Sequence, residues 1–241
     1  MSGGIVVRAV TFDYWNTIVR ADADQASHRR RAWQLEYASA GYTVDDEVLR
    51  AAFRTVWSRH HEAWLRNEQL TGEQAAVEAI DLVGLPVDGP TRHRLVERFL
   101  TVGEEAGFGL CEGVADILAD LHGRGVRLGI VCDVGFTPSP GLRRILERFE
   151  LLRYFSGWSF SDEVGWYKPA PEIFRHALAY LDVPAVEAAH VGDLRRTDVA
   201  GARAMGMTAV RYRGANDDVS DGPEGDHVLD HHAALPVALA L

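Results

Sequence analysis

The residues of this chain with the clearest potential for chemistry are acidic side chains placed after apolar runs. Asp13, Asp133 and Asp193 each follow such a run, and Asp198 comes shortly after the last of them. Carboxylates that fold together repel one another unless a hard cation joins them, and Mg²⁺ takes one or two protein carboxylates, waters and a phosphate as ligands. If folding gathers these residues, their types predict phosphoryl chemistry at a divalent metal.

A basic residue, Lys168, stands directly before Pro169. In a loop at the same site, its ammonium group would pair with a nucleophilic carboxylate and supply the positive charge that a phosphoryl transition state needs. Taken alone, Lys168 is better interpreted as a surface lysine before a helix, and Asp13 is equally a turn residue. The functional interpretation depends on these residues meeting in space.

The elements that position these residues alternate between strand and helix. Apolar runs predict strands that end at Asp13 and near Cys132, and further strands over residues 157–160, 188–191 and 208–212, with an edge strand at 228–229. Helical patterns cover 114–124, 142–149, 171–181 and 198–205. This alternation predicts a parallel sheet, in which the carboxyl ends of the strands face one crevice.

A block of about 90 residues interrupts this rhythm with helical periodicity alone. The expected helices cover 29–40, 45–67, 71–83 and 91–105, with breaks at Gly41, Gly84 and Gly107. We therefore predict an α/β fold: a Rossmann-like, three-layer core with a parallel sheet, formed by residues 1–19 and 110–241, and an inserted all-helical cap domain over 20–109.

The composition narrows the classes of function. The chain has 241 residues, a net charge of -10 and two cysteines, Cys111 and Cys132. An acidic chain is a poor ligand for nucleic acid, which binds to a positive face. The sequence shows no signal peptide and no run near the ~20 apolar residues of a membrane span. We expect a cytoplasmic protein, a monomer or homodimer, that partners with neither nucleic acid nor membrane.

The order of these motifs resembles the haloacid dehalogenase superfamily of hydrolases, subfamily I type, with a helical C1 cap. The superfamily pattern Asp-x-Asp-x-Thr is represented by Asp13-Tyr14-Trp15-Asn16-Thr17, and the strand with a following loop by residues 129–135. The lysine motif corresponds to Lys168-Pro169-Ala170-Pro171, and Gly-Asp with a later Asp to residues 192–198. Each motif is weak by itself, but their order covers nearly the whole chain.

The resemblance implies roles for individual residues. Asp13 would attack phosphorus and form an aspartyl phosphate, with Lys168 orienting it. Mg²⁺ would be held by Asp13, Asp193, the backbone carbonyl of Trp15 and, directly or through water, Asp198. The phosphate of a small phosphorylated metabolite would be held by four residues: Thr17, Cys132, Asp133 and Lys168.

Two residues depart from the superfamily pattern. Trp15 replaces the second Asp of the first motif, which in phosphatases of this family protonates the leaving alcohol and activates water. The loss of a general acid/base typically costs ~10²- to 10⁴-fold in rate. Cys132 replaces Ser or Thr, and a thiol is the weaker hydrogen-bond donor.

Three explanations follow from these departures. The protein is a phosphatase whose leaving group needs little protonation, such as an acyl, enol or aryl phosphate, or whose missing acid comes from the cap or from Asp133. Alternatively, it resembles the L-2-haloacid dehalogenases, which also have an aromatic residue at the position of Trp15 and attack carbon. Those enzymes act without metal and lack the acid at the position of Asp193. The third explanation is a catalytically degenerate binding or regulatory protein.

Overall fold

A computed structural model describes residues 6–21, 25–105 and 107–241. The chain forms two compact units. The first unit comprises Met1–Arg20, Phe108–Asp133 and Leu146–Leu241, and the second comprises Ala21–Gly107 and Val134–Ile145. The predicted domain bounds stay a prediction. They differ from this division by placing 134–145 in the core and residues 20, 108 and 109 in the cap. Residues 1–5 of the predicted core and 22–24 and 106 of the predicted cap lie outside the described residues.

The first unit, called the core unit here, contains a parallel sheet of six strands in the order β5-β4-β1-β6-β7-β8. The strands are β1 (Ala9–Phe12), β4 (Arg127–Cys132), β5 (Phe155–Phe160), β6 (Ala188–Gly192), β7 (Thr208–Tyr212) and β8 (His227–Leu229). The fully buried residues of β1 occupy the middle of the sheet, because β1 pairs with both β4 and β6. The α/β fold predicted from the sequence is confirmed.

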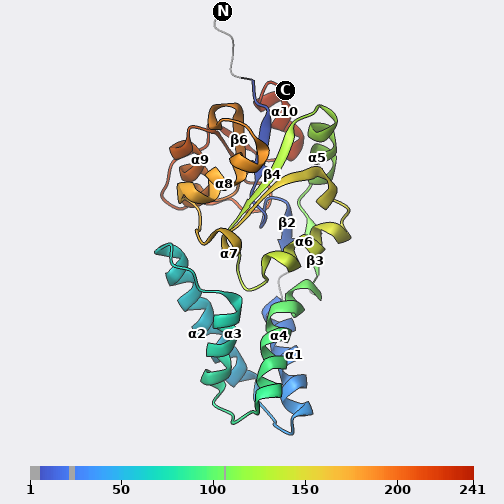
Figure 1. The fold of residues 1–241 in the computed structure, drawn as a ribbon, viewed down its shortest axis with the longest axis vertical. Helices are drawn as coiled ribbons and strands as arrows, with labels where there is room; N and C mark the ends of the chain where they lie inside the picture. The colour runs from blue at the N-terminus through green and yellow to red at the C-terminus, as the bar shows by residue number, and fades with distance from the viewer. Residues whose placement is uncertain (1–5, 22–24, 106) are drawn as a thin grey trace, which may run out of the picture. The chain divides into compact units, whose positions relative to one another are not determined.

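Helices cover both faces of this sheet. Figure 1 shows α8 and α9 on one face and α5 on the other. The helices are α5 (Val114–Gly123), α7 (Ser161–Val164), α8 (Pro171–Leu181), α9 (Ala200–Met205) and α10 (Leu235–Ala238), while α6 (Ser139–Arg148) begins in the second unit and ends in the first. Helix α8 begins where the sequence predicts, because Pro171 presets the backbone of a first helical turn. A two-stranded sheet, β2 (Val19–Ala21) with β3 (Phe108–Leu110), was not predicted.

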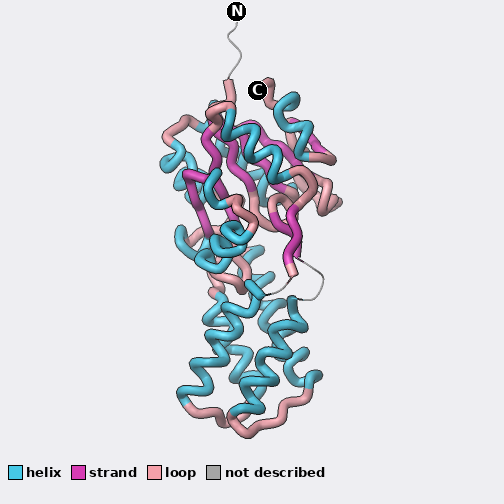
Figure 2. Tube along the Cα trace, turned by 90° about the vertical axis from the view of Figure 1, so that its right-hand side faces the viewer, coloured by secondary structure: helices cyan, strands magenta, loops and turns pink. Residues whose placement is uncertain are grey.

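The second unit, called the helical unit here, contains α1 (Gln25–Ser39), α2 (Asp46–Leu65), α3 (Gly72–Val83) and α4 (Gly89–Glu105), which are drawn in cyan in Figure 2. These helices match the four predicted ones within a few residues. A capping box between Thr71 and Gln74 starts α3, and Gly84, in the left-handed conformation, ends it. Trp33 is fully buried in the core of this unit, where its indole N–H donates to the carbonyl of Leu95 at 2.8 Å.

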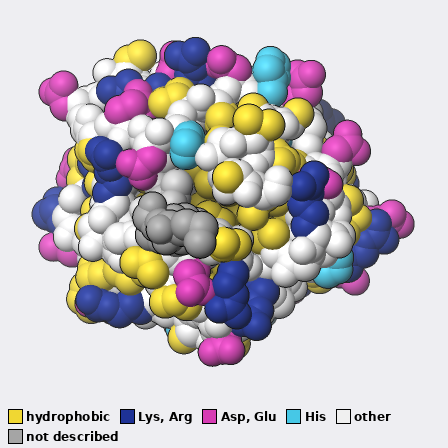
Figure 3. All heavy atoms as spheres, turned by 90° about the horizontal axis from the view of Figure 1, so that it is seen from above, with side chains coloured by type: hydrophobic (Ala, Val, Ile, Leu, Met, Phe, Trp, Pro, Cys, Tyr) yellow, Lys and Arg dark blue, Asp and Glu magenta, His cyan; other side chains and the backbone are white. Residues whose placement is uncertain are grey.

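The surface carries mixed charge in the view from above in Figure 3, where acidic and basic side chains lie interspersed around the rim. Of the helices in the described residues, none is both long and apolar enough to span a bilayer.

Candidate active site

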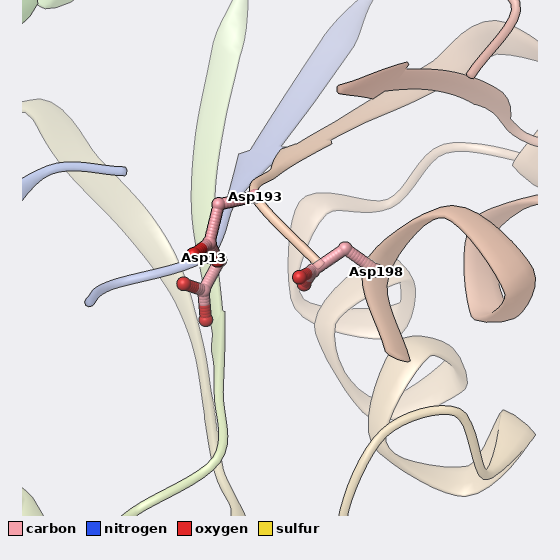
Figure 4. Close-up of side chains that lie close together, drawn as sticks. All are labelled: Asp13, Asp193 and Asp198. Atoms are coloured by element: carbon pink, nitrogen blue, oxygen red, sulfur yellow. The ribbon is translucent and has the colours of Figure 1, made fainter. Parts of the chain in front are cut away.

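The carboxyl ends of adjacent strands bring Asp13 and Asp193 together. Strands β1 and β6 pair in parallel with Phe12 opposite Val191, so the residues that follow them leave the sheet at the same edge. The backbone N–H of Asp13 extends this ladder by donating to the carbonyl of Val191 at 2.8 Å. Oxygens of Asp13, Asp193 and Asp198 all lie within 4.8 Å of one another, and Figure 4 shows the three carboxylates gathered at the strand ends.

Asp198 enters this cluster from a π-helix, Arg195–Val199, that precedes α9. Its Oδ2 accepts from the backbone N–H of Leu194 at 3.0 Å, which fixes the carboxylate against the loop after β6. Gly192 makes this approach possible, because a Cβ at that position would lie 2.2 Å from Cγ of Asp198. The Gly-Asp pair therefore has a steric reason as well as a chemical one.

Lys168 lies between two of the three carboxylates. Its Nζ donates to Oδ1 of Asp13 and, at 2.7 Å, to Oδ1 of Asp198, and the residue is 2% exposed. Its backbone N–H donates to Oδ1 of Asp133 at 2.8 Å, so the acid after β4 holds the lysine loop in place. The structure thus brings together Asp13, Lys168, Asp193 and Asp198, as predicted, and gives Asp133 a contact with the lysine backbone.

Burial and charge oppose one another in this cluster. Burial raises the pKa of Asp13 well above its usual value despite the Lys168 ammonium, and burial together with Asp198 raises the pKa of Asp193 to about 7. Burial would also raise the pKa of Asp198, but Lys168 and His190 outweigh it and hold that pKa well below its usual value. Within the described residues, Lys168 is the one ammonium that contacts these carboxylates, so the cluster can take further positive charge.

His190 completes the cluster, and the sequence did not single it out. Its Nε2 lies 3.0 Å from Oδ1 of Asp198, and its Nδ1 lies 2.8 Å from the hydroxyl of Thr11. Burial lowers the pKa of His190, and an ionised carboxylate only accepts. We therefore assign the Nε2–H tautomer, in which Thr11 donates to Nδ1. Position 190, inside a buried strand, gave no local signal beyond a polar residue in an apolar run.

Asn216 is a second residue that the sequence missed. Its side-chain amide donates to Oδ2 of Asp193 at 2.7 Å, and the amide of Asn16 lies 3.5 Å from the same oxygen. Asn216 belongs to a loop rich in Gly, Asp and Asn between β7 and β8. The composition of that loop predicts a turn, but it does not indicate which side chain returns to the site.

The remaining predicted residues surround Asp13. The hydroxyl of Thr17 lies 3.5 Å from Oδ2 of Asp13. Cys132 is fully buried at the end of β4, and its thiol donates weakly to the carbonyl of Asp133 at 3.5 Å. The ring of Trp15 packs edge-on against Tyr14, and the two ring centroids are 4.9 Å apart. The centroid of the Trp15 ring also lies 6.0 Å from that of Phe108.

The donor set fits a hard divalent cation. Three carboxylates offer oxygen atoms, the ligands that Mg²⁺ prefers. Asp198 is the least available of the three carboxylates. Its Oδ1 already accepts from Lys168 and His190, and its Oδ2 from Leu194 and, at 3.4 Å, from Thr197. The arrangement favours direct ligation by Asp13 and Asp193, with Asp198 holding the lysine.

Known proteins resemble this chain in sequence and in fold. The sequence model of the family described as haloacid dehalogenase-like hydrolase matches residues 7–206. The phosphoglycolate phosphatase of Salmonella paratyphi A is 31% identical over 215 residues, covering 85% of this chain and 80% of that protein. A 2-haloacid dehalogenase from Pseudomonas syringae shares the fold with a TM-score of 0.73 at 23% identity, covering 98% of this chain and 99% of that one. The HAD-hydrolase YfnB from Bacillus subtilis, bound to magnesium, does so with a TM-score of 0.68 at 18% identity, covering 98% and 100%.

Proposed function

Because this chain belongs to the haloacid dehalogenase-like hydrolases, we propose that it is a Mg²⁺-dependent phosphatase of small phosphorylated metabolites, with Asp13 as its nucleophile. Two observations together carry the proposal. The ammonium group of Lys168 donates to Asp13, and carboxylate oxygens of Asp13, Asp193 and Asp198 lie within 4.8 Å of one another. Phosphatases among the relatives and a magnesium-bound structural neighbour support it.

In the proposed reaction, a carboxylate oxygen of Asp13 attacks phosphorus and the bond from phosphorus to the leaving oxygen breaks. Water then cleaves the aspartyl phosphate, which releases inorganic phosphate and returns Asp13. Lys168 holds Asp13 in one orientation, and its charge favours the ionised carboxylate that the attack needs. Thr17, Cys132, Asp133 and Lys168 are the proposed phosphate contacts.

Asp13, Asp193 and the backbone carbonyl of Trp15 would hold Mg²⁺, and Asp198 would act through water. The bound ion would neutralise charge on the phosphate oxygens and align them for attack. The filled hydrogen-bonding positions of Asp198 support its indirect role. Asn216 would keep one oxygen of Asp193 oriented toward the ion.

Trp15 narrows the proposed substrates. Its indole, packed against Tyr14 and Phe108, has no carboxyl group with which to protonate a leaving alcohol. Acyl, enol and aryl phosphates need this proton least, because their leaving oxygens are stable anions. We therefore place the substrate in one of these classes, unless Asp133 or the helical unit supplies the acid.

Dehalogenation of a 2-haloacid is the second candidate, because Trp15 is aromatic as in the L-2-haloacid dehalogenases. Asp193, held by Asn216 and Asn16, favours phosphoryl chemistry, since those enzymes lack an acid at that position. A catalytically degenerate binding or regulatory protein is the third. We also propose a cytoplasmic location, which the free cysteines Cys111 and Cys132 support. A monomer or homodimer stays a prediction.

One set of assays separates these functions. Purified protein, with Mg²⁺ or with EDTA, is given acetyl phosphate, p-nitrophenyl phosphate and L-2-chloropropionate, in parallel with Asp13→Asn. We expect phosphate release that needs Mg²⁺ and falls about 10⁴-fold or more in Asp13→Asn. Chloride release without metal would support the dehalogenase. No release from any substrate, together with no Mg²⁺ binding in calorimetry, would support the degenerate protein.

The role of Trp15 has its own test. If a missing proton carrier limits the rate, Trp15→Asp raises turnover of alkyl phosphates, by up to the ~10²- to 10⁴-fold that a general acid supplies. An unchanged rate in a folded variant would contradict this explanation.

A further inference from the structure

The helical unit contains a pocket of about 630 Å³. Every residue that lines it belongs to this unit, from α1, α2, α4 and the segment 134–145. Four aromatic rings form its walls: Phe53, Trp57, Phe99 and Phe136. A volume of this size is typical of sites for small organic ligands.

The charged side chains that line this pocket are all cationic, and they are four arginines. Ser58 and His61 are the other polar lining residues, and no lining residue carries a carboxylate. Two of the arginines have acidic partners elsewhere, since Arg30 donates to Asp46 at 3.0 Å and Arg50 donates to Asp46 at 2.6 Å. The charges of Arg29 and Arg54 have no such partner in the described part of the chain.

Arg29 is the unusual member, because it is only 6% exposed. Its Nε donates to the carbonyl of Phe99 at 3.1 Å and its Nη2 to the hydroxyl of Thr137 at 2.9 Å. Its guanidinium carbon lies 5.5 Å from the ring centre of Phe99 and 6.0 Å from that of Phe136. These neutral partners leave the other N–H groups of Arg29 without an acceptor among the described residues, and its charge without a counter-ion.

A buried charge without a counter-ion is costly, because the group has lost its water and gained no opposite charge. Burial lowers the pKa of Arg29 to about 10, so the side chain is still a cation at neutral pH. An anionic group in the pocket would supply a negative charge opposite Arg29 and accept hydrogen bonds from its remaining N–H groups.

Trp57 is the main exposed apolar side chain of the pocket. It lines the pocket and is 56% exposed, although its ring is one of the largest apolar surfaces of the unit. The ring stacks on His60, with centroids 5.7 Å apart, and meets Phe136 edge-on at 5.3 Å, so its orientation is supported from two directions. An oriented, half-exposed indole is a surface on which a flat apolar group stacks.

We propose that this pocket binds a small organic anion with a flat, apolar ring. The anionic group of the ligand would contact Arg29 and Arg54, and its ring would stack against Trp57. None of the residues that line this pocket is one of the proposed phosphatase residues, and the inference does not depend on their activity. Carboxylates, sulfonates and phosphate esters of aromatic rings share the required chemistry.

The test uses three probes that divide this chemistry: naphthalene-2-sulfonate has ring and charge, methanesulfonate has the charge, and 2-naphthalenemethanol has the ring. Calorimetry is done on the full chain in EDTA, for the wild type and for Asp13→Asn. We expect naphthalene-2-sulfonate to bind about tenfold or more tightly than either of the others, with equal affinity in both proteins.

Two variants and a control locate the binding. Arg29→Met and Trp57→Ala are each expected to weaken naphthalene-2-sulfonate about tenfold or more. Arg66→Met, an exposed arginine paired with Glu68 outside the pocket, should bind as the wild type does. If Arg29→Met does not fold, Trp57→Ala decides, because that half-exposed side chain can be removed without opening the core.

Four results would overturn the proposal. They are equal binding of the three probes, no binding of naphthalene-2-sulfonate, undiminished binding in Trp57→Ala, and loss of binding in Asp13→Asn alone. The proposed phosphatase activity is tested by turnover, so either proposal can fail without the other.

Discussion

The core unit and the helical unit each bury a basic side chain, but they surround it differently. In the core unit, Lys168 lies between the carboxylates of Asp13 and Asp198, and the pair of contacts raises its pKa against the lowering effect of burial. In the helical unit, Arg29 lies against two aromatic rings, a carbonyl and a hydroxyl. Among the described residues, Lys168 has anionic partners and Arg29 has none.

This difference separates two uses of a buried charge. A matched ammonium fixes the orientation of a carboxylate before any substrate arrives, which suits a nucleophile. An unmatched guanidinium leaves its counter-charge to a ligand, which suits binding. The core unit also shows a third solution in His232, a buried imidazole that stays neutral.

The largest expected effect comes from removing the matched cation. Lys168→Met leaves Asp13 and Asp198 buried without their partner, and breaking a buried pair typically costs ~3–5 kcal/mol. Urea unfolding with Mg²⁺ absent measures this loss in the free energy of unfolding. A variant as stable as the wild type would show that the carboxylates do not need the ammonium, and the comparison would fail.

The next effect is a pH dependence caused by His232. Its Nε2 donates to the carbonyl of Thr17 at 2.8 Å, its ring stacks on Tyr212, and burial lowers its pKa from 6.5 to about 4. Between pH 6.5 and pH 4, His232 is mostly protonated in the unfolded chain and mostly neutral in the folded protein. The stability from His232 is therefore complete above pH 6.5 and is lost as the pH falls toward 4, by about 3 kcal/mol.

Unfolding by urea at pH 7 and pH 4 measures this loss. His232→Phe keeps a ring against Tyr212 and should lose about 3 kcal/mol less than the wild type over that range. His231→Gln, at the exposed neighbouring position, should keep the wild-type dependence. Identical pH dependence in all three proteins would show that His232 is not the group responsible.

A smaller effect is expected from the residue that orients Asp193. Asn216→Ala removes the hydrogen bond to Oδ2 of Asp193, and the loss of such an outer partner typically weakens metal binding ~10- to 100-fold. Calorimetric titration with Mg²⁺ measures the change. Asp221→Asn, in the exposed part of the same loop, is the control and should bind Mg²⁺ as the wild type does.

The smallest change in stability is expected from removing Arg29. Arg29→Met removes the unmatched cation while keeping a similar apolar length, and replacing a buried charge by an apolar side chain is often neutral or stabilising. We expect the free energy of unfolding to stay within about 1 kcal/mol of the wild type or to rise. A loss as large as that in Lys168→Met would mean that Arg29 is matched by the protein after all.

Much of the core unit could be predicted from the sequence because its signals are local. Apolar runs fixed the strands, and the acids after them indicated the edge at which Asp13 and Asp193 meet. Pro171 marked the start of a helix in the core unit, and Gly84 marked the end of a helix in the helical unit, at the residues where the structure has them.

The residues that escaped prediction act through tertiary contacts. His190 contacts both Thr11 and Asp198, and Asn216 contacts Asp193, through side-chain geometry that no periodic pattern records. The burial of Arg29 was equally hidden, because its run of basic residues is also typical of a solvated helix face. The grouping of residues 134–145 with the helical unit depends on tertiary contacts and on nothing in their composition.

Lys168 is the only lysine in the sequence, and every other basic residue apart from histidine is arginine. Isotopic enrichment of lysine alone therefore places a single nitrogen-15 ammonium in the whole protein, at the centre of the carboxylate cluster. Its resonance would report charge, proton exchange and occupancy of the cluster without a mutation or an overlapping signal. The sequence therefore provides a unique position for a spectroscopic label within the carboxylate cluster.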